Sequence, residues 1–446
     1  MTRRFFGTDG IRGPVGGPLI NPEFAARLGA AAGKWAGGVG VAVIGRDTRA
    51  SGIAIEAAVA RWLASAGLKV ISLGVLPTPA IARAVRDRGA ALGVVITASH
   101  NPASDNGVKF FGPGGTKLED AAEAAMEARL PPAAASLADA RMEHDDAALG
   151  SYIDAMAGSL PPAALAGWRI VLDTANGATA VSSPAVLRKL GAEIDRLGAS
   201  PDGTNINEGV GSEHPEKLAA RVRAWGARIG IAHDGDGDRC VVCDETGAVL
   251  DGDEVLTILG LHALRTGRLV NRELVITVQS NLGVDEAIRA AGGTVFRTAV
   301  GDRYVLERMR ASGASLGGES SGHVVCADLA MTGDGLATAL RILAVMRDTG
   351  RPLSELRTQL RRFPQVSRSV VVPERRPLTE CPLLSKEIGA LERELAGAGR
   401  VLVRYSGTEP KLRFLVEARD EAVARRGLDR LEAAARTDLS LPSVSC

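Results

Sequence analysis

Three short apolar runs of the chain each end in a distinct polar loop. They are Leu92 to Ile96 before Thr97 to Pro102, Ile229 to Ala232 before His233 to Arg239, and Ala314 to Leu316 before Gly317 to His323. Short apolar runs of this kind are typical of buried strands in a parallel sheet. Helix patterns alternate with them, which predicts three similar α/β units with mixed, mostly parallel sheets. Ligands bind beyond the carboxyl ends of such strands, so the three loops could converge on one cleft.

The alternation of strand and helix patterns changes after Pro364. Val401 to Arg404 and Leu412 to Ala418 have strand patterns, and Glu421 to Ala435 has a helix pattern, but the earlier rhythm is gone. This predicts a smaller C-terminal α+β domain. We therefore expect four domains around a central cleft, with bounds 1–160, 161–252, 253–364 and 365–446.

Composition excludes several classes of protein. Lys and Arg number 53 against 52 Asp and Glu, so no basic excess indicates a nucleic-acid or membrane partner. No apolar run reaches membrane-spanning length, and Arg3-Arg4 precedes no signal-peptide core. Five scattered cysteines indicate reduced thiols in a cytoplasmic protein, and we expect Cys240 and Cys243 to be small core residues. The oligomeric state stays open, with a homodimer as one option.

Ser99 directly follows the first of these strands. A serine at such a strand end can carry a phosphoryl group that it later hands on. The alternative is an ordinary loop serine beside the turn-forming Asn101-Pro102. Adjacent side chains point apart in extended backbone, so His100 is not expected to form a ready-made dyad with Ser99. Lys109 could reach back toward Ser99, although a solvated lysine is the more common case.

Asp234, Asp236 and Asp238 alternate with glycines. In extended backbone these three carboxylates share one face, and hard oxygen ligands suit Mg²⁺. An acidic surface turn or a calcium loop is the alternative. Glu245 stands at the twelfth position that a calcium loop requires, but the strand-like run Cys240 to Val242 intervenes and argues against such a loop. We predict one Mg²⁺ site.

Further loops offer groups for binding an anion and for contacting hydroxyl groups. Ser406, Gly407 and Thr408 provide hydroxyls and flexible backbone for an anion, and Arg404 and Arg413 provide charge. The loop Gly317 to His323 combines carboxylate, hydroxyl and imidazole groups, which suit sugar hydroxyls and proton transfer. Two more candidates are Arg12, in the glycine-rich opening loop, and Gly301-Asp302-Arg303.

Together these motifs resemble the bacterial phosphoglucosamine mutases of the α-D-phosphohexomutase superfamily. The resemblance covers essentially the whole chain, and its motifs occur in order: Gly7 to Gly13, Thr97 to Pro102, Asp234 to Arg239, Gly318 to His323 and Arg404 to Pro410. One departure is Ser320, where the family leads us to expect glutamine.

The resemblance implies a role for each loop. Ser99 would be an activating phosphoserine, and the three aspartates would bind Mg²⁺ together with its phosphate. The Glu319 loop would recognise the sugar, and the loop after Arg404 would hold the non-reacting phosphate. The catalytic candidates are Ser99, His100, Lys109, His323 and Arg12. The substrate-binding candidates are Arg239, Asp302, Arg303, Glu319, Ser321, Arg404, Ser406, Gly407, Thr408 and Arg413.

The implied reaction interconverts glucosamine 6-phosphate and glucosamine 1-phosphate through glucosamine 1,6-bisphosphate. The product would feed UDP-N-acetylglucosamine and cell-envelope synthesis. A phosphoglucomutase or phosphomannomutase is the alternative within the superfamily. A Mg²⁺-dependent sugar phosphatase and a non-catalytic sugar-phosphate binder are alternatives outside it. The phosphatase leaves the second phosphate site unexplained, and the binder leaves Ser99 beside three aspartates unexplained.

Overall fold

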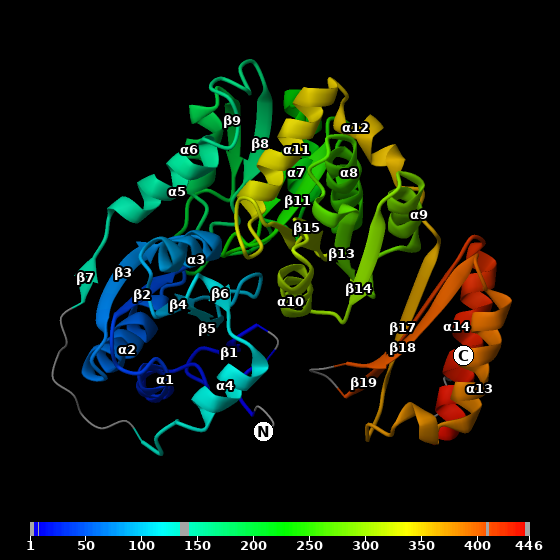
Figure 1. Ribbon diagram of the computed structural model, residues 1–446, viewed down its shortest axis with the longest axis horizontal. Coiled ribbons are helices and arrows are strands. Elements are labelled where there is room, and N and C mark those ends of the chain that lie inside the picture. Colours follow the sequence, from blue (N-terminus) through cyan, green and yellow to red (C-terminus); the bar gives the residue numbers. More distant parts are fainter. Residues whose placement is uncertain (1–3, 8, 134–141, 407–409, 442–446) are drawn as a thin grey trace.

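The structure, a computed structural model, describes residues 4–7, 9–133, 142–406 and 410–441. Figure 1 shows four groups of helices and strands that follow one another along an arc, from the blue N-terminal group to the orange and red C-terminal group. We call them domains I to IV. No helix in the described part of the chain is long and apolar enough to cross a membrane.

Domain I is built on a sheet of strand order β1-β5-β4-β2-β3-β7, with β6 paired to β5. Its strands are β1 (Ile11–Pro14), β2 (Val41–Arg46), β3 (Lys69–Val75), β4 (Leu92–Ile96), β5 (Asp105–Gly112), β6 (Thr116–Lys117) and β7 (Glu143–His144). Its helices are α1 (Pro22–Trp35), α2 (Gly52–Ser65), α3 (Thr78–Asp87) and α4 (Asp120–Glu127). Side chains alternate across a strand, so Val94 packs beneath α1 and α2 while Val95 packs beneath α3.

Domains II and III follow the same plan. Domain II contains β8 (Arg169–Asp173), α6 (Ser182–Lys189), β9 (Glu193–Leu197), α7 (Glu216–Trp225), β10 (Ile229–His233), β11 (Cys240–Asp244) and β12 (Val249–Leu250). Domain III contains α8 (Gly252–Arg265), β13 (Glu273–Thr277), α9 (Leu282–Ala290), β14 (Thr294–Thr298), α10 (Asp302–Ser312), β15 (Leu316–Gly318), β16 (Val324–Cys326) and α11 (Gly335–Thr349). The helix α5 (Ala147–Ala157) lies between domains I and II and packs on α3 and α6.

One strand pattern recurs in the three sheets. The orders β3-β2-β4-β5, β9-β8-β10-β11 and β14-β13-β15-β16 are equivalent. In each, the first three strands are parallel, and the fourth runs antiparallel to the third and follows it along the chain. The connecting loops carry Ser99, the three aspartates and Glu319 respectively. The predicted repeat of three α/β units is therefore confirmed.

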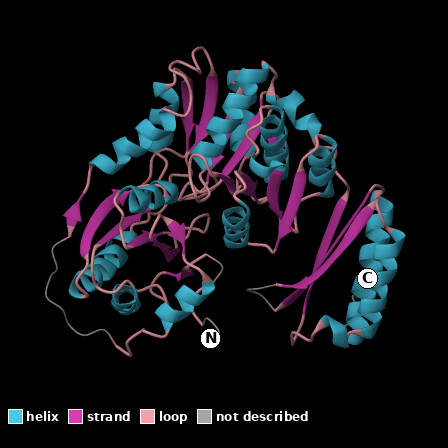
Figure 2. Ribbon diagram, viewed as in Figure 1, coloured by secondary structure: helices cyan, strands magenta, loops and turns pink. Residues whose placement is uncertain are grey.

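Domain IV has a different architecture. Its three strands, in the order β17-β19-β18, are antiparallel. The elements are β17 (Gln365–Val371), α13 (Pro382–Glu394), β18 (Gly399–Tyr405), β19 (Lys411–Ala418) and α14 (Glu421–Asp438), and the short helix α12 (Leu353–Leu356) precedes them. Figure 2 shows both long helices on one face of this sheet, which leaves the other face toward domain III. The predicted smaller α+β domain is confirmed, while the proposed bounds of all four domains stay predictions.

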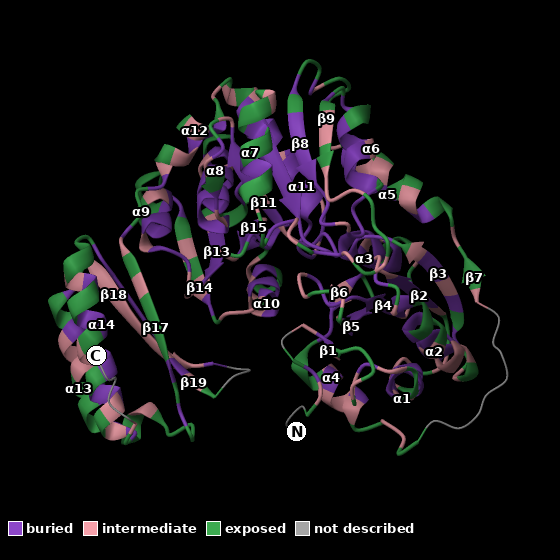
Figure 3. Ribbon diagram, turned by 180° about the vertical axis from the view of Figure 1, so that it is seen from behind, coloured by how far each residue is buried: buried purple, intermediate pink, exposed green. Residues whose placement is uncertain are grey.

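The apolar core is also divided between domains I to III and domain IV. One continuous cluster of buried side chains runs through domains I, II and III, from Val43 to Leu360. Domain IV has a cluster of its own that includes Leu412 and Leu431. In Figure 3 the central strands of domain II are largely buried, while the outer sides of α13 and α14 are exposed. Cys240 and Cys243 are buried free thiols, as predicted.

Candidate active site

Ser99 lies just beyond the carboxyl end of β4 in a left-handed backbone conformation, with a φ of 53°. The residue is buried, and its N–H donates to Oγ1 of Thr97 over 2.9 Å. Its carbonyl oxygen accepts from Nη2 of Arg49 at 3.1 Å and from Nδ2 of Asn207 at 2.9 Å. A left-handed serine is unfavourable unless its surroundings hold it. The surrounding donors therefore hold the loop of Ser99 in a defined shape.

Arg49 and Asn207 shape this loop from two different domains. Arg49 is fully buried, and its guanidinium also donates to the carbonyls of Asn101 at 2.7 Å and Asp105 at 2.8 Å. Asn207, from the loop between β9 and α7, donates to the carbonyl of Asn101 at 2.9 Å. Both side chains thus bind the carbonyls of Ser99 and Asn101. Neither residue was among the predicted site residues.

The left-handed turn also changes the relation between Ser99 and His100. The distance from Oγ of Ser99 to Nδ1 of His100 is 3.3 Å. The expectation that these side chains point apart assumed extended backbone, and it is wrong here because Ser99 is left-handed. Burial lowers the pKa of His100, and the charge of Arg239 lowers it further. A neutral imidazole is therefore favoured within reach of the serine hydroxyl.

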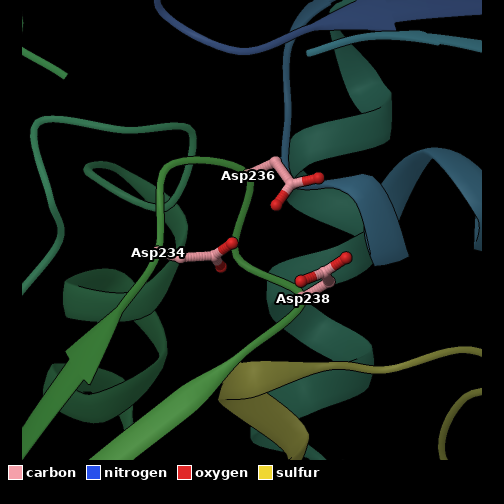
Figure 4. A group of neighbouring side chains, drawn as sticks. All are labelled: Asp234, Asp236 and Asp238. Carbon is pink, nitrogen blue, oxygen red and sulfur yellow. The ribbon is translucent and has the colours of Figure 1, made fainter. Parts of the chain in front are cut away.

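Asp234, Asp236 and Asp238 follow β10, and Figure 4 shows their carboxylates converging on one small space. All three residues are buried, and one oxygen from each lies within 4.8 Å of the others. The hydroxyl of Ser99 donates to Oδ2 of Asp234 over 2.5 Å. A Cβ on Gly235 would lie 2.7 Å from the carbonyl oxygen of Ser99. Glycine at this position therefore allows the two loops to approach.

The charge in this space suits a divalent cation. Burial raises the pKa of Asp234 well above its ordinary value, and the charges of Asp236 and Asp238 raise it further. The Oδ1 atoms of Asp236 and Asp238 are buried and have no hydrogen-bond partner among the described residues. Buried carboxylate oxygens that lack donors are costly unless a cation compensates them. The three aspartates therefore fit a hard divalent metal ion.

Lys109, on β5, is a cation beside the triad. Its Nζ lies 2.8 Å from Oδ2 of Asp236, 3.5 Å from Oδ2 of Asp238 and 2.8 Å from Oδ2 of Asp9. Burial lowers its pKa, but the three carboxylates outweigh burial and raise the pKa above its usual value. Arg12 also pairs with Asp9, and its Nη1 donates to the carbonyl of Ala98 at 3.4 Å. Arg12 lies in strand β1 and not in a loop as predicted, because Ile11–Pro14 pairs with β5, and it brings positive charge to the loop of Ser99.

The loops of domain III complete this cluster. Nε2 of His323 lies 3.3 Å from Oδ2 of Asp302, and its Nδ1 lies 3.7 Å from Oδ1 of Asp238. Burial lowers the pKa of His323, but the two aspartates outweigh burial and raise it. Glu319 accepts the N–H of Gly301 at 3.0 Å, and burial raises its pKa. These contacts bring the predicted sugar loop next to the metal triad.

Two of the predicted arginines bind protein carboxylates. Nη1 of Arg239 lies 3.5 Å from Oε1 of Glu213. The backbone N–H of Arg239 donates to Oδ1 of Asp234 over 3.2 Å. Arg303 is buried, and its guanidinium pairs with Asp120 and with Oε1 of Glu123, at 2.6 Å, on α4. Arg303 therefore joins domain III to domain I. A direct contact between this residue and the substrate stays a prediction, as does contact by Ser321, which is exposed.

The predicted phosphate-binding residues lie in domain IV. Arg404 and Arg413 face each other across β18 and β19 and line a pocket of about 490 Å³. Burial lowers the pKa of Arg404, and the neighbouring Arg413 lowers it further. The N–H of Ser406 donates to the carbonyl of Lys411 over 2.8 Å. Gly407 and Thr408 lie outside the described residues. An anion would relieve the repulsion between the paired guanidiniums.

Comparison with known families agrees with this arrangement. Models of the phosphoglucomutase/phosphomannomutase α/β/α domains I, II and III match residues 3–134, 150–247 and 251–363, and the model of the C-terminal domain matches 369–434. The chain belongs to the phosphoglucomutase/phosphomannomutase family. It is therefore an enzyme, an isomerase that moves a phosphoryl group, as the resemblance implied.

Curated relatives are similar over nearly the full chain. The phosphoglucosamine mutase of Aeromonas hydrophila is 45% identical, with 97% of this chain and 98% of the relative covered. The phosphoglucosamine mutase of Desulforudis audaxviator is 47% identical, with 96% of each covered. The resemblance to this group is thus confirmed.

Solved structures agree with the fold. A phosphoglucomutase/phosphomannomutase family protein from Burkholderia thailandensis has a TM-score of 0.83 at 26% identity, with 97% of each chain covered. A putative phosphomannomutase from Thermus thermophilus has a TM-score of 0.79 at 26% identity, with 97% of this chain and 98% of the other covered. The four-domain architecture is therefore shared with members of the family.

Proposed function

We propose that the enzyme interconverts glucosamine 6-phosphate and glucosamine 1-phosphate, with Ser99 as the residue that carries the phosphoryl group. One observation supports this most strongly. The hydroxyl of Ser99 lies 2.5 Å from Oδ2 of Asp234, in a triad whose other two members each keep a buried oxygen without a hydrogen-bond donor in the described structure. A nucleophile from domain I and a cation site from domain II are thus combined in one buried site. The substrate follows from the names of the curated relatives.

The reaction has two transfers, each of a different phosphoryl group. In the first, the P–O bond to Oγ of Ser99 breaks while a P–O bond forms to the C1 hydroxyl of glucosamine 6-phosphate; that hydroxyl loses its proton, and Oγ of Ser99 takes one up. The product is glucosamine 1,6-bisphosphate, which turns over within the site. In the second, the P–O bond at C6 breaks while a P–O bond forms to Oγ of Ser99; the Ser99 hydroxyl loses its proton, the C6 oxygen takes one up, and glucosamine 1-phosphate leaves. Lys109 and Arg12 stabilise the charge on the transferred phosphoryl group.

Proton transfer needs a group whose charge can change near neutral pH. His100 is the candidate nearest to Ser99, at 3.3 Å from Oγ to Nδ1, and its neutral ring can accept a proton. His323 lies beside Asp238 and is held by Asp302 and Asp238. The pKa of His323 is raised, so its ring favours the protonated form that can donate. The two histidines thus suit opposite roles.

One Mg²⁺ fits the metal site. Asp234, Asp236 and Asp238 would hold it together with a phosphate oxygen on Ser99, since Mg²⁺ prefers carboxylate and phosphate oxygens. When bound, a divalent cation neutralises charge on a phosphoryl group. The Oδ1 atoms of Asp236 and Asp238, which accept no hydrogen bond in the described structure, are available to it. The charges of the site residues match a phosphoryl group and one cation bound together.

The substrate would be held at both ends. The loop of Glu319 would accept hydrogen bonds from sugar hydroxyls, and Arg404, Arg413 and the loop after them would bind the phosphate that is not reacting. That site must accept a phosphate at C1 or at C6, so recognition by charge is appropriate. The product, glucosamine 1-phosphate, would be a precursor in the cytoplasm for the synthesis of UDP-N-acetylglucosamine and of the cell envelope.

A comparison of substrates tests the proposal. We expect kcat/KM to favour glucosamine 1-phosphate over glucose 1-phosphate and mannose 1-phosphate, because a site built for an amine leaves polar groups unpaired with the wrong sugar. The measurement is direct competition between the sugar phosphates with product identification. A preference for glucose or mannose phosphate would overturn the substrate and leave the chemistry of Ser99 standing. Release of inorganic phosphate without isomerised sugar would identify a phosphatase instead.

A further inference from the structure

Six largely buried side chains from domains I, II and III form a closed ring of alternating charge beside the triad. In order around the ring they are Asp9, Lys117, Asp302, His323, Asp238 and Lys109. Four of the six are predicted site residues with a place in the proposed reaction or its site. Asp9 and Lys117 have no such place. The ring matters because Asp9 and Asp302, on either side of Lys117, contact different catalytic candidates.

Lys117 closes the ring at the junction between domains I and III. It ends the short strand β6, opposite Phe111 of β5, and only 8% of the residue is exposed. Its Nζ donates to Oδ1 of Asp9 over 2.5 Å and to Oδ2 of Asp302. Burial lowers the pKa of Lys117, but Asp302 and Asp9 outweigh burial and raise it above its usual value. Lys117 is therefore a charged lysine between two carboxylates.

Each of those carboxylates holds a different catalytic candidate. Asp9 uses its Oδ2 to bind Lys109 at 2.8 Å and also pairs with Arg12. Asp302 uses its Oδ2 to bind Nε2 of His323 at 3.3 Å. A buried carboxylate that loses its cation keeps the desolvation cost without the compensating attraction, and it then moves or takes up a proton. The positions of Lys109, Arg12 and His323 thus depend on the positive charge of Lys117.

We propose that Lys117 is a positioning residue for phosphoryl transfer, which fixes Asp9 and Asp302 so that these orient Lys109 and Arg12 on one side and His323 on the other. The inference rests on the proposed function. Lys117 acts through its two carboxylates, since its hydrogen bonds go to Asp9 and Asp302 and not to Ser99 or the triad. Groups that orient the residues in contact with a reacting centre typically change activity about 10- to 100-fold when removed.

Arg303, the neighbour of Asp302, attaches helix α10 to domain I without the help of Lys117. Arg303 pairs with Asp120 and Glu123 on α4, so the first two residues of α10 bind domain I through opposite charges. Removing the charge of Lys117 leaves the contacts of Arg303 in place. Helix α10 therefore stays attached to domain I, and the change is confined to the orientation of Asp9 and Asp302 and of the groups that they hold.

The test is Lys117→Met, which keeps the length of the side chain and removes its charge. We expect kcat to fall about 10- to 100-fold while KM stays near the wild-type value, because Lys117 orients groups that act in the transition state. Lys117→Arg restores the charge and should recover much of the lost kcat. Lys69→Met is the matched control, because Lys69 is an exposed lysine of the same domain, paired with Glu143 at 3.0 Å. Its kcat and KM should equal those of the wild type.

The kinetics are measured with the hexose phosphate that the wild type converts fastest, so a different sugar preference corrects the proposed substrate without affecting this inference. A folded Lys117→Met variant with wild-type kcat, or one with raised KM and unchanged kcat, would overturn it. If Lys117→Met does not fold, Asp302→Asn opens the ring at the same carboxylate. The same loss of kcat is then expected, and wild-type kcat in that variant overturns the positioning role.

Discussion

The two ends of the proposed substrate site are built differently. Around Ser99, three domains with one continuous core supply buried side chains that are paired with one another. In domain IV, Arg404 and Arg413 lie side by side on a sheet that packs on a core of its own. In the first region opposite charges lie in contact, whereas in the second two guanidiniums face each other across neighbouring strands and line a pocket.

This difference suggests separate roles, with phosphoryl transfer at the Ser99 region and substrate binding at domain IV. The contacts around Ser99 hold its charged groups in fixed positions, which is what stabilisation of a transition state requires. The arginines of domain IV gain most when a phosphate arrives, and a phosphate that does not react contributes to binding in the ground state and the transition state alike. Changes near Ser99 should therefore lower kcat, and changes near Arg404 should mainly raise KM.

The largest effect is expected for Ser99→Ala, which removes the proposed phosphoryl carrier. The kcat of the mutase reaction should fall by about 10⁴-fold or more, as for other nucleophiles that act in a covalent step. The melting temperature should stay close to that of the wild type, because Arg49 and Asn207 bind the backbone of this loop and not the hydroxyl. Ser65→Ala, on the exposed side of α2, is the control. Near-normal turnover by Ser99→Ala would remove the covalent mechanism.

A smaller loss is expected for Asp236→Asn, which removes one charged oxygen ligand but keeps the shape of the side chain. We expect kcat to fall about 10- to 100-fold and the Mg²⁺ concentration for half-maximal activity to rise. Exhaustive chelation should stop the wild type, and added Mg²⁺ should restore it. Asp154→Asn changes an exposed aspartate of α5 that pairs with Lys189 and should behave as the wild type. Full activity after chelation would show that the triad has another role.

A change of KM is expected for Arg404→Ala in domain IV. Loss of one charged phosphate contact should raise KM for the sugar phosphate about 10-fold, with a much smaller change in kcat. Arg425→Ala, an exposed arginine of α14 that pairs with Glu421, is the matched control. If Arg404→Ala instead lowers kcat as strongly as the triad variant, the contrast between the two regions is wrong.

The smallest effect is expected from salt. Mobile ions screen exposed charges more than buried ones, so KM should rise about two- to threefold between roughly 0.02 M and 0.2 M salt, while kcat changes little. The measurement is initial-rate kinetics at fixed Mg²⁺ with an inert monovalent salt. A kcat that falls in parallel with the rise in KM would mean that the ion pairs around Lys109 are open to solvent.

Many helices and strands could be predicted from local sequence patterns. The pairing of strands that are distant in sequence could not. The β-α-β rhythm predicted the three α/β units, because each strand and helix carries its own period. Helix α11 was not predicted, since Gly335 to Met346 is buried on almost every side and shows no polar face. The shared strand pattern of the three sheets required the structure, because it depends on which strands pair.

The candidate site was predictable where neighbours in sequence share a function. Asp234, Asp236 and Asp238 are such a group, and the structure places them beside Ser99 and Lys109. Arg49 was missed because a lone arginine in a turn looks like a surface residue, although its position in the turn that directly follows β2 was a usable signal. Lys117 was missed because its partner Asp302 lies 185 residues away in sequence. Only the fold brings such charges together.

The central claim is that Ser99 donates a phosphoryl group to one position of the sugar and accepts another from a second position of the same sugar. The most direct measurement is a single turnover of enzyme that bears a radiolabelled phosphoryl group, mixed with unlabelled glucosamine 6-phosphate and analysed for labelled products. The account predicts that the label leaves Ser99, appears in glucosamine 1,6-bisphosphate and then in glucosamine 1-phosphate, while the phosphate from C6 takes its place on the enzyme. Label that stays on the protein, maps to a residue other than Ser99, or appears as inorganic phosphate would contradict it.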